Sequence, residues 1–374
     1  MSTIVDADAI VVGAGIAGAS VAYFLAPQAR VLVLEREPHP GMHSTGRSAA
    51  MFMESYGSPQ VRALTRASRA FLEHPPAGFA AQPILRPRGA LYIGRAEQAA
   101  EVEALFEAIR PYEMHARRLD AAALQACVPV LEPAFAVCGL LDPGAADIDV
   151  NELHQGFLRG LRARGGKLQC DVAIRAIERV QGRWRLDCGD ALFRAPLLVD
   201  AAGAWADEVA RLAGVAPIGL EPRRRSAFLF APPPGLATAH WPCVAGIDES
   251  FYFKPDAGLL LGSPANADPV APHDVQPEEI DIATGIARIE AATRLRIRRP
   301  TRTWAGLRSF VADGDLVGGF APGVEDFFWV AGQGGYGMQT SAAMGEACAR
   351  LALGRALPAH VAAAGLTAAM LGPR

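Results

Sequence analysis

The chain has 374 residues, 51% of them hydrophobic, and a formal net charge of -3. This length allows about two domains, and the hydrophobic share is sufficient for a sizeable core. The weak negative charge gives no reason to expect a nucleic acid or an anionic membrane surface as a partner. We find no run of about 18 apolar residues that would predict an integral membrane segment. The polar start of the chain shows no signal-peptide pattern.

The cysteines are scattered single residues, at Cys127, Cys138, Cys170, Cys188, Cys243 and Cys348. They form no CxxC pair and no metal-ligand spacing, so we expect no metal site. Unpaired cysteines fit a reducing compartment, which predicts a cytoplasmic protein, at most peripheral to the inner membrane.

The stretch from Ala9 to Glu35 predicts a dinucleotide-binding unit. A short apolar run is followed by the motif G-x-G-x-x-G at Gly13, Gly15 and Gly18, then by a helical stretch and a second apolar run. The second run ends at Glu35, about 20 residues after the glycines, as the dinucleotide fingerprint requires. This context separates the motif from an ordinary glycine-rich helix start.

Each of these residues has a physical role in such a unit. Gly13 permits the tight turn, Gly15 lets a pyrophosphate approach the backbone, and Gly18 allows close packing of helix on strand. The helix N-terminus offers unpaired N–H groups and a positive dipole end to the phosphates. The carboxylate of Glu35 is suited to accept hydrogen bonds from a ribose.

A segment rich in hydroxyl and small side chains, HSTGRSAAMF, begins at His43. Ser44, Thr45 and Ser48 can donate or accept hydrogen bonds, and Ala49 allows close approach of a ligand. An ordinary helix N-cap explains the same composition equally well.

The remaining patterns predict helices over 61–72, 96–110, 119–131, 147–164 and 277–292, and strands over 90–93, 168–180, 184–188, 191–193, 303–310 and 327–331. Alternating strands between 220 and 269, separated by Pro and Gly turns, predict an antiparallel sheet. A further strand, turn and helix over 197–214 indicate a return to the nucleotide domain. A second glycine-rich turn, Gly332 to Gly337, again leads from a strand into a helix.

Together the motifs resemble those of FAD-dependent amino-acid oxidoreductases of the D-amino-acid oxidase and glycine oxidase superfamily, most closely bacterial D-arginine dehydrogenases. The resemblance is carried by GAGIAGAS, VLE, HSTGRSA, AAGAW, RRRSAF, SFYFKPD, LLGSPANADP, TWAGLRSF and GQGGYGMQTSAAMGE. It implies an α/β fold in which a Rossmann-like FAD-binding domain, made of residues 1–85, 145–218 and 300–374, carries an antiparallel-sheet substrate-binding domain, made of 86–144 and 219–299.

The resemblance also implies non-covalent FAD and the residues that hold it. Gly13, Gly15, Ala17 and Gly18 would contact the pyrophosphate, and Glu35, followed by Arg36, the adenosine ribose. The flavin side would be formed by Ser44, Thr45, Arg47, Ser48, Ala49, Ala202, Gly203, Gly332, Gly334, Gly335, Tyr336, Gly337 and Gln339.

On the substrate side, the resemblance makes Arg308 with Tyr252 the carboxylate clamp and Arg225 a substrate-facing arginine. Tyr56 would be a lid tyrosine, and the carbonyl of Gly335 would meet the substrate amine. The chemistry agrees, because a planar guanidinium holds a carboxylate through two parallel hydrogen bonds. Surface ion pairing is the alternative for each arginine, and packing is the alternative for each tyrosine.

An amino acid held in this way can direct its Cα hydrogen at flavin N5, and transfer of hydride then needs mostly positioning. The imine product would hydrolyse to a 2-oxo acid and ammonia. The expected partners are thus an amino-acid substrate and a quinone or other electron acceptor.

The side-chain pocket departs from the arginine-preferring pattern. Those relatives carry a glutamate after the PRP turn, where this chain has Ala90, and more polar residues where it has Met51, Phe52 and Met53. A buried guanidinium without a partner is costly. We therefore expect a D-amino-acid dehydrogenase shifted from cationic toward neutral, apolar or bulky side chains, unless Glu54 or Glu249 supplies an acid.

Two other readings stay open at this point. A related flavoenzyme that oxidises a 2-hydroxy acid or a secondary amine of the sarcosine or glycine type would use the same clamp. A non-catalytic flavin-binding protein would lack any substrate that reduces its flavin. The sequence alone leaves oxidase and dehydrogenase activity, and the oligomeric state, undecided.

Overall fold

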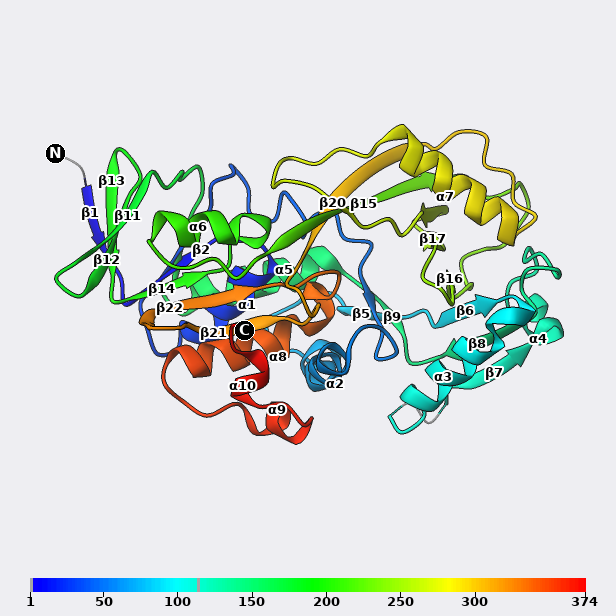
Figure 1. Ribbon diagram of the computed structural model, residues 1–374, viewed down its shortest axis with the longest axis horizontal. Coiled ribbons are helices and arrows are strands. Elements are labelled where there is room, and N and C mark those ends of the chain that lie inside the picture. Colours follow the sequence, from blue (N-terminus) through cyan, green and yellow to red (C-terminus); the bar gives the residue numbers. More distant parts are fainter. Residues whose placement is uncertain (1–2, 113–114) are drawn as a thin grey trace.

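A computed structural model describes residues 3–112 and 115–374. Residues 1, 2, 113 and 114, which the expected domain boundaries include, lie outside the described residues. The chain forms two regions joined by long strands (Figure 1). Within the described ranges, no helix combines the length and apolar character needed to cross a membrane.

A mostly parallel sheet is the central layer of the first region. Strands β10, β3, β2, β14 and β22 run parallel in that order, and β21 adds an antiparallel edge. These strands span Lys167–Gln169, Val31–Leu34, Ala9–Val12, Leu197–Asp200, Val324–Ala331 and Val317–Ala321. The sheet therefore brings together three separated parts of the chain.

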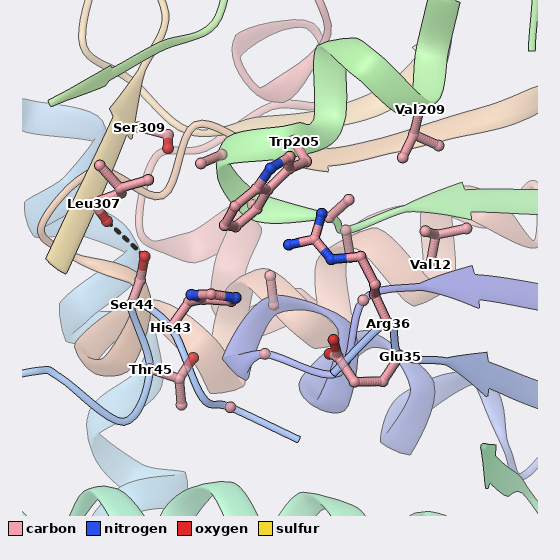
Figure 2. A pocket seen from close by; sticks show the side chains of 18 of the residues that line it. Val12, Glu35, Arg36, His43, Ser44, Thr45, Trp205, Val209, Leu307 and Ser309 are labelled. Carbon is pink, nitrogen blue, oxygen red and sulfur yellow. Dashed lines mark hydrogen bonds between the residues drawn. The ribbon is translucent and has the colours of Figure 1, made fainter. Parts of the chain in front are cut away.

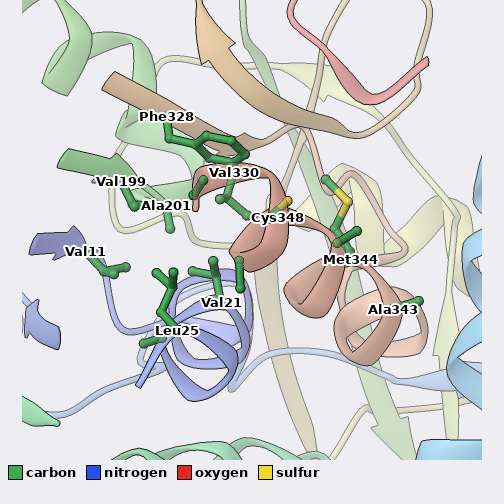
Figure 3. Close-up of a cluster of buried hydrophobic side chains, with 14 of the residues drawn as sticks. Val11, Val21, Leu25, Val199, Ala201, Phe328, Val330, Ala343, Met344 and Cys348 are labelled. Atoms are coloured by element: carbon green, nitrogen blue, oxygen red, sulfur yellow. The ribbon is translucent and has the colours of Figure 1, made fainter. Parts of the chain in front are cut away.

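Side chains alternate between the two faces of this sheet, as successive residues of a strand must. Val11, Val199 and Phe328 pack against the helices α1 (Ile16–Leu25) and α8 (Gly337–Ala352), as Figure 3 shows. The neighbouring residues Ile10 and Leu198 face the other side. Helices α2 (Pro59–Glu73) and α5 (Val150–Ala163) extend the helical layer, since α2 contacts α8 and α5 contacts α1.

The opposite face is covered by a small sheet and a short helix. The small sheet has the order β1-β13-β12-β11 and lies at the end of the molecule that holds the N-terminus (Figure 1). Its strands span Thr3–Asp6, Ala191–Ala195, Arg183–Asp187 and Ala176–Val180, and the 3-10 turn η2 (Gly203–Trp205) leads into helix α6 (Ala206–Leu212). Trp184 and Phe193 of this sheet join the same buried cluster as Ile10.

The second region is built on a larger, mainly antiparallel sheet with the order β19-β15-β18-β17-β16-β6-β8-β7, in which β20 pairs with β15. The strands span Asp268–Pro269, Glu221–Phe230, Leu259–Ser263, Tyr252–Asp256, Cys243–Gly246, Ala90–Gly94, Cys138–Asp142, Arg117–Asp120 and, for β20, Arg302–Phe310. One junction, β16 with β6, is parallel. The long pair β15 and β20 reaches from this sheet to the first region (Figure 1).

Smaller elements complete the structure. The three-stranded sheet β4-β9-β5 (Met51–Phe52, Ala146–Ile148 and Leu85–Pro87) lies between the two regions. The larger sheet carries the helices α3 (Ala99–Ile109, preceded by the 3-10 turn η1 at Ala96–Gln98), α4 (Ala121–Cys127) and α7 (Glu279–Ala292). The chain ends in α9 (Ala359–Ala363) and α10 (Ala368–Leu371).

Most of the predicted elements are present, but two predictions are wrong. The strand predicted over 168–180 divides into β10 and β11, which belong to different sheets. The helix predicted over 119–131 is only α4, because 117–120 pairs with β8 as a strand. The predicted domain boundaries stay a prediction: β20, which they assign to the first region, pairs with β15 and also lines the cleft of the first region through Leu307 and Ser309.

Candidate active site

A long cleft opens at the carboxyl ends of β2, β3 and β14, the place where open α/β sheets bind their ligands. It encloses about 1260 Å³, including space open to solvent. Of the residues predicted to hold the cofactor, the cleft is lined by Gly13, Gly15, Ala17, Glu35, Arg36, Ser44, Thr45, Ala202, Gly203 and Gly334. The cleft suits an extended ligand such as a dinucleotide.

The glycine motif has the geometry that the sequence predicts. Gly13 has φ of +96°, and a Cβ there would lie 2.6 Å from the carbonyl oxygen of Ala201. A Cβ on Gly18 would lie 1.9 Å from the Gly13 carbonyl oxygen, so this glycine serves helix packing and does not line the cleft. Thr45 Oγ1 accepts a hydrogen bond from Ile16 N at 2.9 Å. The loop that begins at His43 therefore meets the helix N-terminus directly.

Glu35 lies at the floor of the cleft (Figure 2). Its carboxylate accepts hydrogen bonds from Ala14 N at 2.8 Å and from Glu37 N at 3.0 Å. Two backbone donors thus fix its orientation at the end of β3. A carboxylate held in this position keeps free lone pairs that can accept hydrogen bonds from ribose hydroxyls.

An aromatic and cationic group forms one wall of the cleft, and Arg36 is its one member that was among the residues predicted to hold the cofactor. The Arg36 guanidinium lies 4.5 Å from the ring centroid of Trp205, and the His43 ring lies 4.8 Å from the same indole. Figure 2 shows the three side chains close to one another. The His43 ring is anchored by Glu37 at 2.9 Å. The motif AAGAW, which ends at Trp205, is the sequence signal that could have indicated this group.

The loop that begins at His43 also ties the cleft to the larger sheet. Ser44 Oγ donates to the Leu307 carbonyl at 2.6 Å (Figure 2). The Arg47 guanidinium donates to the carbonyls of Val275 and Ala305 and pairs with Asp274. Arg47 therefore lines the next cavity but directs its charge toward the protein.

Two further cavities continue the cleft toward the substrate region. The second shares Ile16, Ser44, Thr45 and Gly334 with the first, and shares Arg225, Tyr252, Arg308 and Gly335 with the third. The three cavities therefore adjoin one another, from the helix N-terminus to the cavity that holds both arginines. FAD fits this donor set, because glycine backbones and a helix N-terminus meet phosphates while the carboxylate of Glu35 meets a ribose.

Arg225 and Arg308 lie side by side in the third cavity because of strand register. Arg225 of β15 is opposite Gly306 of β20, and Arg308 is two residues further along β20, on the same face. Gly306 has no side chain between them. Arg308 Nη1 donates to Tyr56 OH at 3.3 Å, and a Cβ on Gly335 would lie 2.6 Å from that Nη1. Tyr252 lines the same space.

The two guanidiniums have opposite pKa shifts. Burial, and then the neighbouring charge of Arg308, lower the pKa of Arg225 to about 10. Burial also opposes the charge of Arg308, but the nearby hydroxyls of Tyr56 and Tyr252 outweigh it, so the pKa of Arg308 lies above its usual value. Arg225 Nε has no hydrogen-bond partner among the described residues. Neither guanidinium forms an ion pair with a carboxylate in the described part of the chain, so this arrangement can bind an anion.

The rest of the third cavity is mainly apolar. Met51 and Met53, predicted for the substrate pocket, line this cavity together with Cys243, Phe251 and Lys254, which the sequence did not single out. Gln339 also lines it, but its amide is engaged: Oε1 accepts from Met53 N at 3.2 Å and Nε2 donates to Thr65 at 2.9 Å.

Three other predicted residues lie outside the cavity linings. Ala90 is 1% exposed and lies behind the wall, paired in register with Cys243. Gly332 and Tyr336 belong to the second glycine-rich turn but line none of the three cavities, and the Tyr336 ring instead packs 5.1 Å from that of Tyr56. Over the described ranges, no group of three or more His, Cys, Asp or Glu side chains could hold a metal ion.

Known proteins with the same architecture cover almost the whole chain. FAD-dependent oxidoreductase domain-containing protein 1 of Bos taurus is 27% identical over 405 aligned residues, which cover 92% of this chain and 81% of that protein. The structure of glycine oxidase from Geobacillus kaustophilus superposes with a TM-score of 0.81 at 21% identity, covering 94% of this chain and 95% of that one. Iminodiacetate oxidase from Chelativorans sp. BNC1 gives 0.81 and 21%, covering 98% of both chains.

Residues 8–351 match the model of the DAO family, described as FAD dependent oxidoreductase. That range includes the glycine motif, Glu35, the loop that begins at His43 and both arginines of the third cavity. The chain belongs to the DAO family of FAD-dependent oxidoreductases, and FAD is its cofactor.

Proposed function

We propose that this protein is an FAD-dependent D-amino-acid dehydrogenase, related in its site to the bacterial D-arginine dehydrogenases, that converts D-amino acids to 2-oxo acids and ammonia. The observation that carries the proposal is the pair of cations Arg225 and Arg308, beside Tyr56, in a cavity that a second, adjoining cavity links to the cofactor cleft by shared lining residues. These groups match the α-carboxylate of an amino acid in charge and geometry.

In this proposal the chain's own residues act by positioning. Arg308, with Arg225, binds the carboxylate, and the hydroxyls of Tyr252 and Tyr56 restrain its orientation. The Gly335 carbonyl accepts a hydrogen bond from the amine. FAD supplies the acceptor for the hydride that leaves Cα. With the substrate held at two points, its Cα hydrogen has one direction available, and such positioning supplies much of the rate.

The cavity walls support a substrate whose side chain is not cationic. Met51 and Met53 line the wall, and Ala90 offers no charge behind it. Glu54, one of the two acids that might have replaced the missing glutamate, pairs with Arg69 at 2.6 Å and does not line the cavity. Glu249 does line it, but it is exposed to solvent. A buried guanidinium or ammonium of the substrate would find no enclosed acid.

The electron acceptor and the location complete the proposal. We assign the enzyme as a dehydrogenase that passes electrons to a quinone or another carrier, in the cytoplasm and at most peripheral to the inner membrane. An oxidase would instead consume O₂ stoichiometrically with substrate, which an oxygen electrode measures directly.

The testing experiment is anaerobic mixing of the FAD-loaded protein with a panel of D- and L-amino acids, followed by visible flavin absorbance. We expect rapid loss of absorbance with neutral D-amino acids such as D-methionine and D-leucine, slow loss with D-arginine, and none with the L-enantiomers. D-Arginine reacting as fast as D-leucine would contradict the side-chain assignment. Reaction with L-enantiomers alone would contradict the stereochemical one.

A second candidate is oxidation of a secondary amine or a 2-hydroxy acid. The structural likeness to glycine oxidase and iminodiacetate oxidase favours the amine form of this candidate, since both act on a carboxylate-bearing amine. The same arginines would hold the carboxylate. Sarcosine, iminodiacetate and D-lactate belong in the same panel, and flavin reduction by one of them but by no D-amino acid would make this candidate the better one.

A further inference from the structure

A buried lysine lies in the cavity beyond the arginine pair. Lys254 and Tyr252 are two residues apart in β17, so their side chains lie on the same face, and both line the cavity. Phe253, between them, points the other way into the core of the larger sheet. Two strand residues advance about 6.6–6.8 Å. The two side chains therefore leave the strand about 6.6–6.8 Å apart and both reach the cavity that holds the arginine pair.

Charge in this part of the cavity is unbalanced. Lys254 Nζ lies 2.6 Å from Asp147 Oδ1, and Arg88 Nε lies 2.7 Å from Asp147 Oδ2. The side chains of Lys254, Asp147 and Arg88 are 7%, 19% and 17% exposed. The single carboxylate of Asp147 thus pairs with two enclosed cations, so these three side chains carry a net charge of about +1. An unpaired charge is costly in such an enclosed region.

The two cations differ in how they are satisfied. Arg88 also donates to the carbonyls of Ala239 at 2.7 Å and Trp241 at 3.1 Å, and it does not line the cavity. Lys254 has Asp147 as its one hydrogen-bond partner among the described residues. An ammonium carries three donors. Two donors of Lys254 are therefore available to a ligand in the cavity.

We propose that Lys254 binds the end of the substrate side chain, and that the preferred substrates carry a carboxylate or carboxamide there, as D-glutamate and D-glutamine do. This inference rests on the proposed function and narrows it. The α-carboxylate occupies Arg225 and Arg308, the apolar wall of Met51 and Met53 packs the side-chain methylenes, and Lys254 donates to the terminal oxygen. A carboxylate also offsets the excess positive charge, so D-glutamate binds more tightly than D-glutamine.

The test compares substrates in the FAD-loaded wild type and Lys254→Met by anaerobic flavin reduction, with D-glutamate, D-glutamine, D-norleucine and D-alanine. Norleucine is an apolar analogue with a four-carbon side chain. Alanine has only a methyl side chain and therefore measures binding by the carboxylate clamp alone. We expect the wild type to bind D-glutamate more tightly than D-norleucine. Loss of a hydrogen bond to a charged group should weaken D-glutamate binding about 10- to 100-fold in Lys254→Met. D-Alanine should be unchanged and D-norleucine unchanged or improved.

Arg88→Met is a matched control. It removes the second cation that pairs with Asp147, and Arg88 does not line the cavity. A lysine that only supports Asp147 would make both variants behave alike and would weaken all four substrates together, which would overturn the inference. Lys254→Arg keeps the charge and should keep the preference for D-glutamate over D-norleucine.

The remaining outcomes are also decisive. If Lys254→Met fails to fold or to bind FAD, the substrate preference of the wild type tests the inference by itself. A preference for D-norleucine over both D-glutamate and D-glutamine refutes it. Reduction by D-alanine, without any preference for D-glutamate over D-norleucine, refutes it while leaving the proposed function intact. Reduction by no amino acid refutes the proposed function itself.

Discussion

Replacement of Arg308 by methionine tests the carboxylate clamp most directly. Arg308 lies on β20, donates to Tyr56 at 3.3 Å and is pressed against the Gly335 backbone. Breaking an enclosed ion pair from one side costs about 3–5 kcal/mol. At about 1.4 kcal/mol per tenfold, kcat/KM should fall by about 10² to 10⁴. Arg225 still offers a charge to the carboxylate, so we expect the lower part of that range.

The assay is anaerobic flavin reduction at several substrate concentrations, which separates binding from the rate of reduction. Arg308→Met should raise the apparent dissociation constant and also slow reduction, because the carboxylate sets the direction of the Cα hydrogen. Arg308→Lys should recover only part of the loss, since an ammonium cannot form two parallel hydrogen bonds.

The matched control is Arg223→Met. Arg223 is paired in register with Arg308, but its side chain is 40% exposed and forms an ion pair with Glu221 at 2.6 Å. The Arg223→Met enzyme should retain wild-type kinetics. An Arg308→Met enzyme within tenfold of the wild type in kcat/KM, with normal FAD content, would refute the assignment of the clamp.

Three further predictions follow from the same geometry. The pKa of Arg225 is lowered to about 10, so affinity for a carboxylate without an amine, such as benzoate, should fall as pH rises through about 10, and a flat profile would contradict this. Arg225→Gln should remove that dependence. Gly18→Ala should reduce FAD affinity about 10- to 100-fold in fluorescence titrations, because its Cβ would lie 1.9 Å from the Gly13 carbonyl oxygen and the helix must shift. Asp200 is fully buried, and burial raises its pKa well above the usual value. The free energy of unfolding should therefore fall as pH rises above the pKa of about 3.9 that this carboxyl has in the unfolded chain. Asp200→Asn keeps the acceptor for Ala202 N and should raise the melting temperature more at pH 8 than at pH 5, whereas an equal change at both values would count against it.

The cofactor half of the site could be predicted because its signals are local. Gly13, Gly18 and Glu35 lie within one strand–helix–strand unit, and each is required by backbone geometry or by a carboxylate at a strand end. The same holds for the long amphipathic helices and for the second glycine-rich turn. Such features depend on neighbours within one unit, which a single sequence records.

The errors arise where pairing partners lie far apart in sequence. The apolar residues of 168–180 look continuous, but β10 pairs with β3 and β11 with β12, so the strand must break between two sheets. Trp205 is distant in sequence from Arg36 and His43, and only the folded chain brings its indole against both. Lys254 resembles a solvent-facing residue of an alternating strand. Its burial follows from Asp147, 107 residues away.

The placement of Arg225 and Arg308 explains how two like charges can stay in one cavity. They lie on adjacent antiparallel strands with Gly306 opposite Arg225, so the strand ladder, not a loop, fixes their separation. The protein tolerates their repulsion, seen in the lowered pKa of Arg225, because β15 and β20 pair along nine registered positions from Glu221 to Leu229. An anion bound between them relieves that repulsion and binds only the folded state. Carboxylate ligands must therefore stabilise the fold as well as occupy the site.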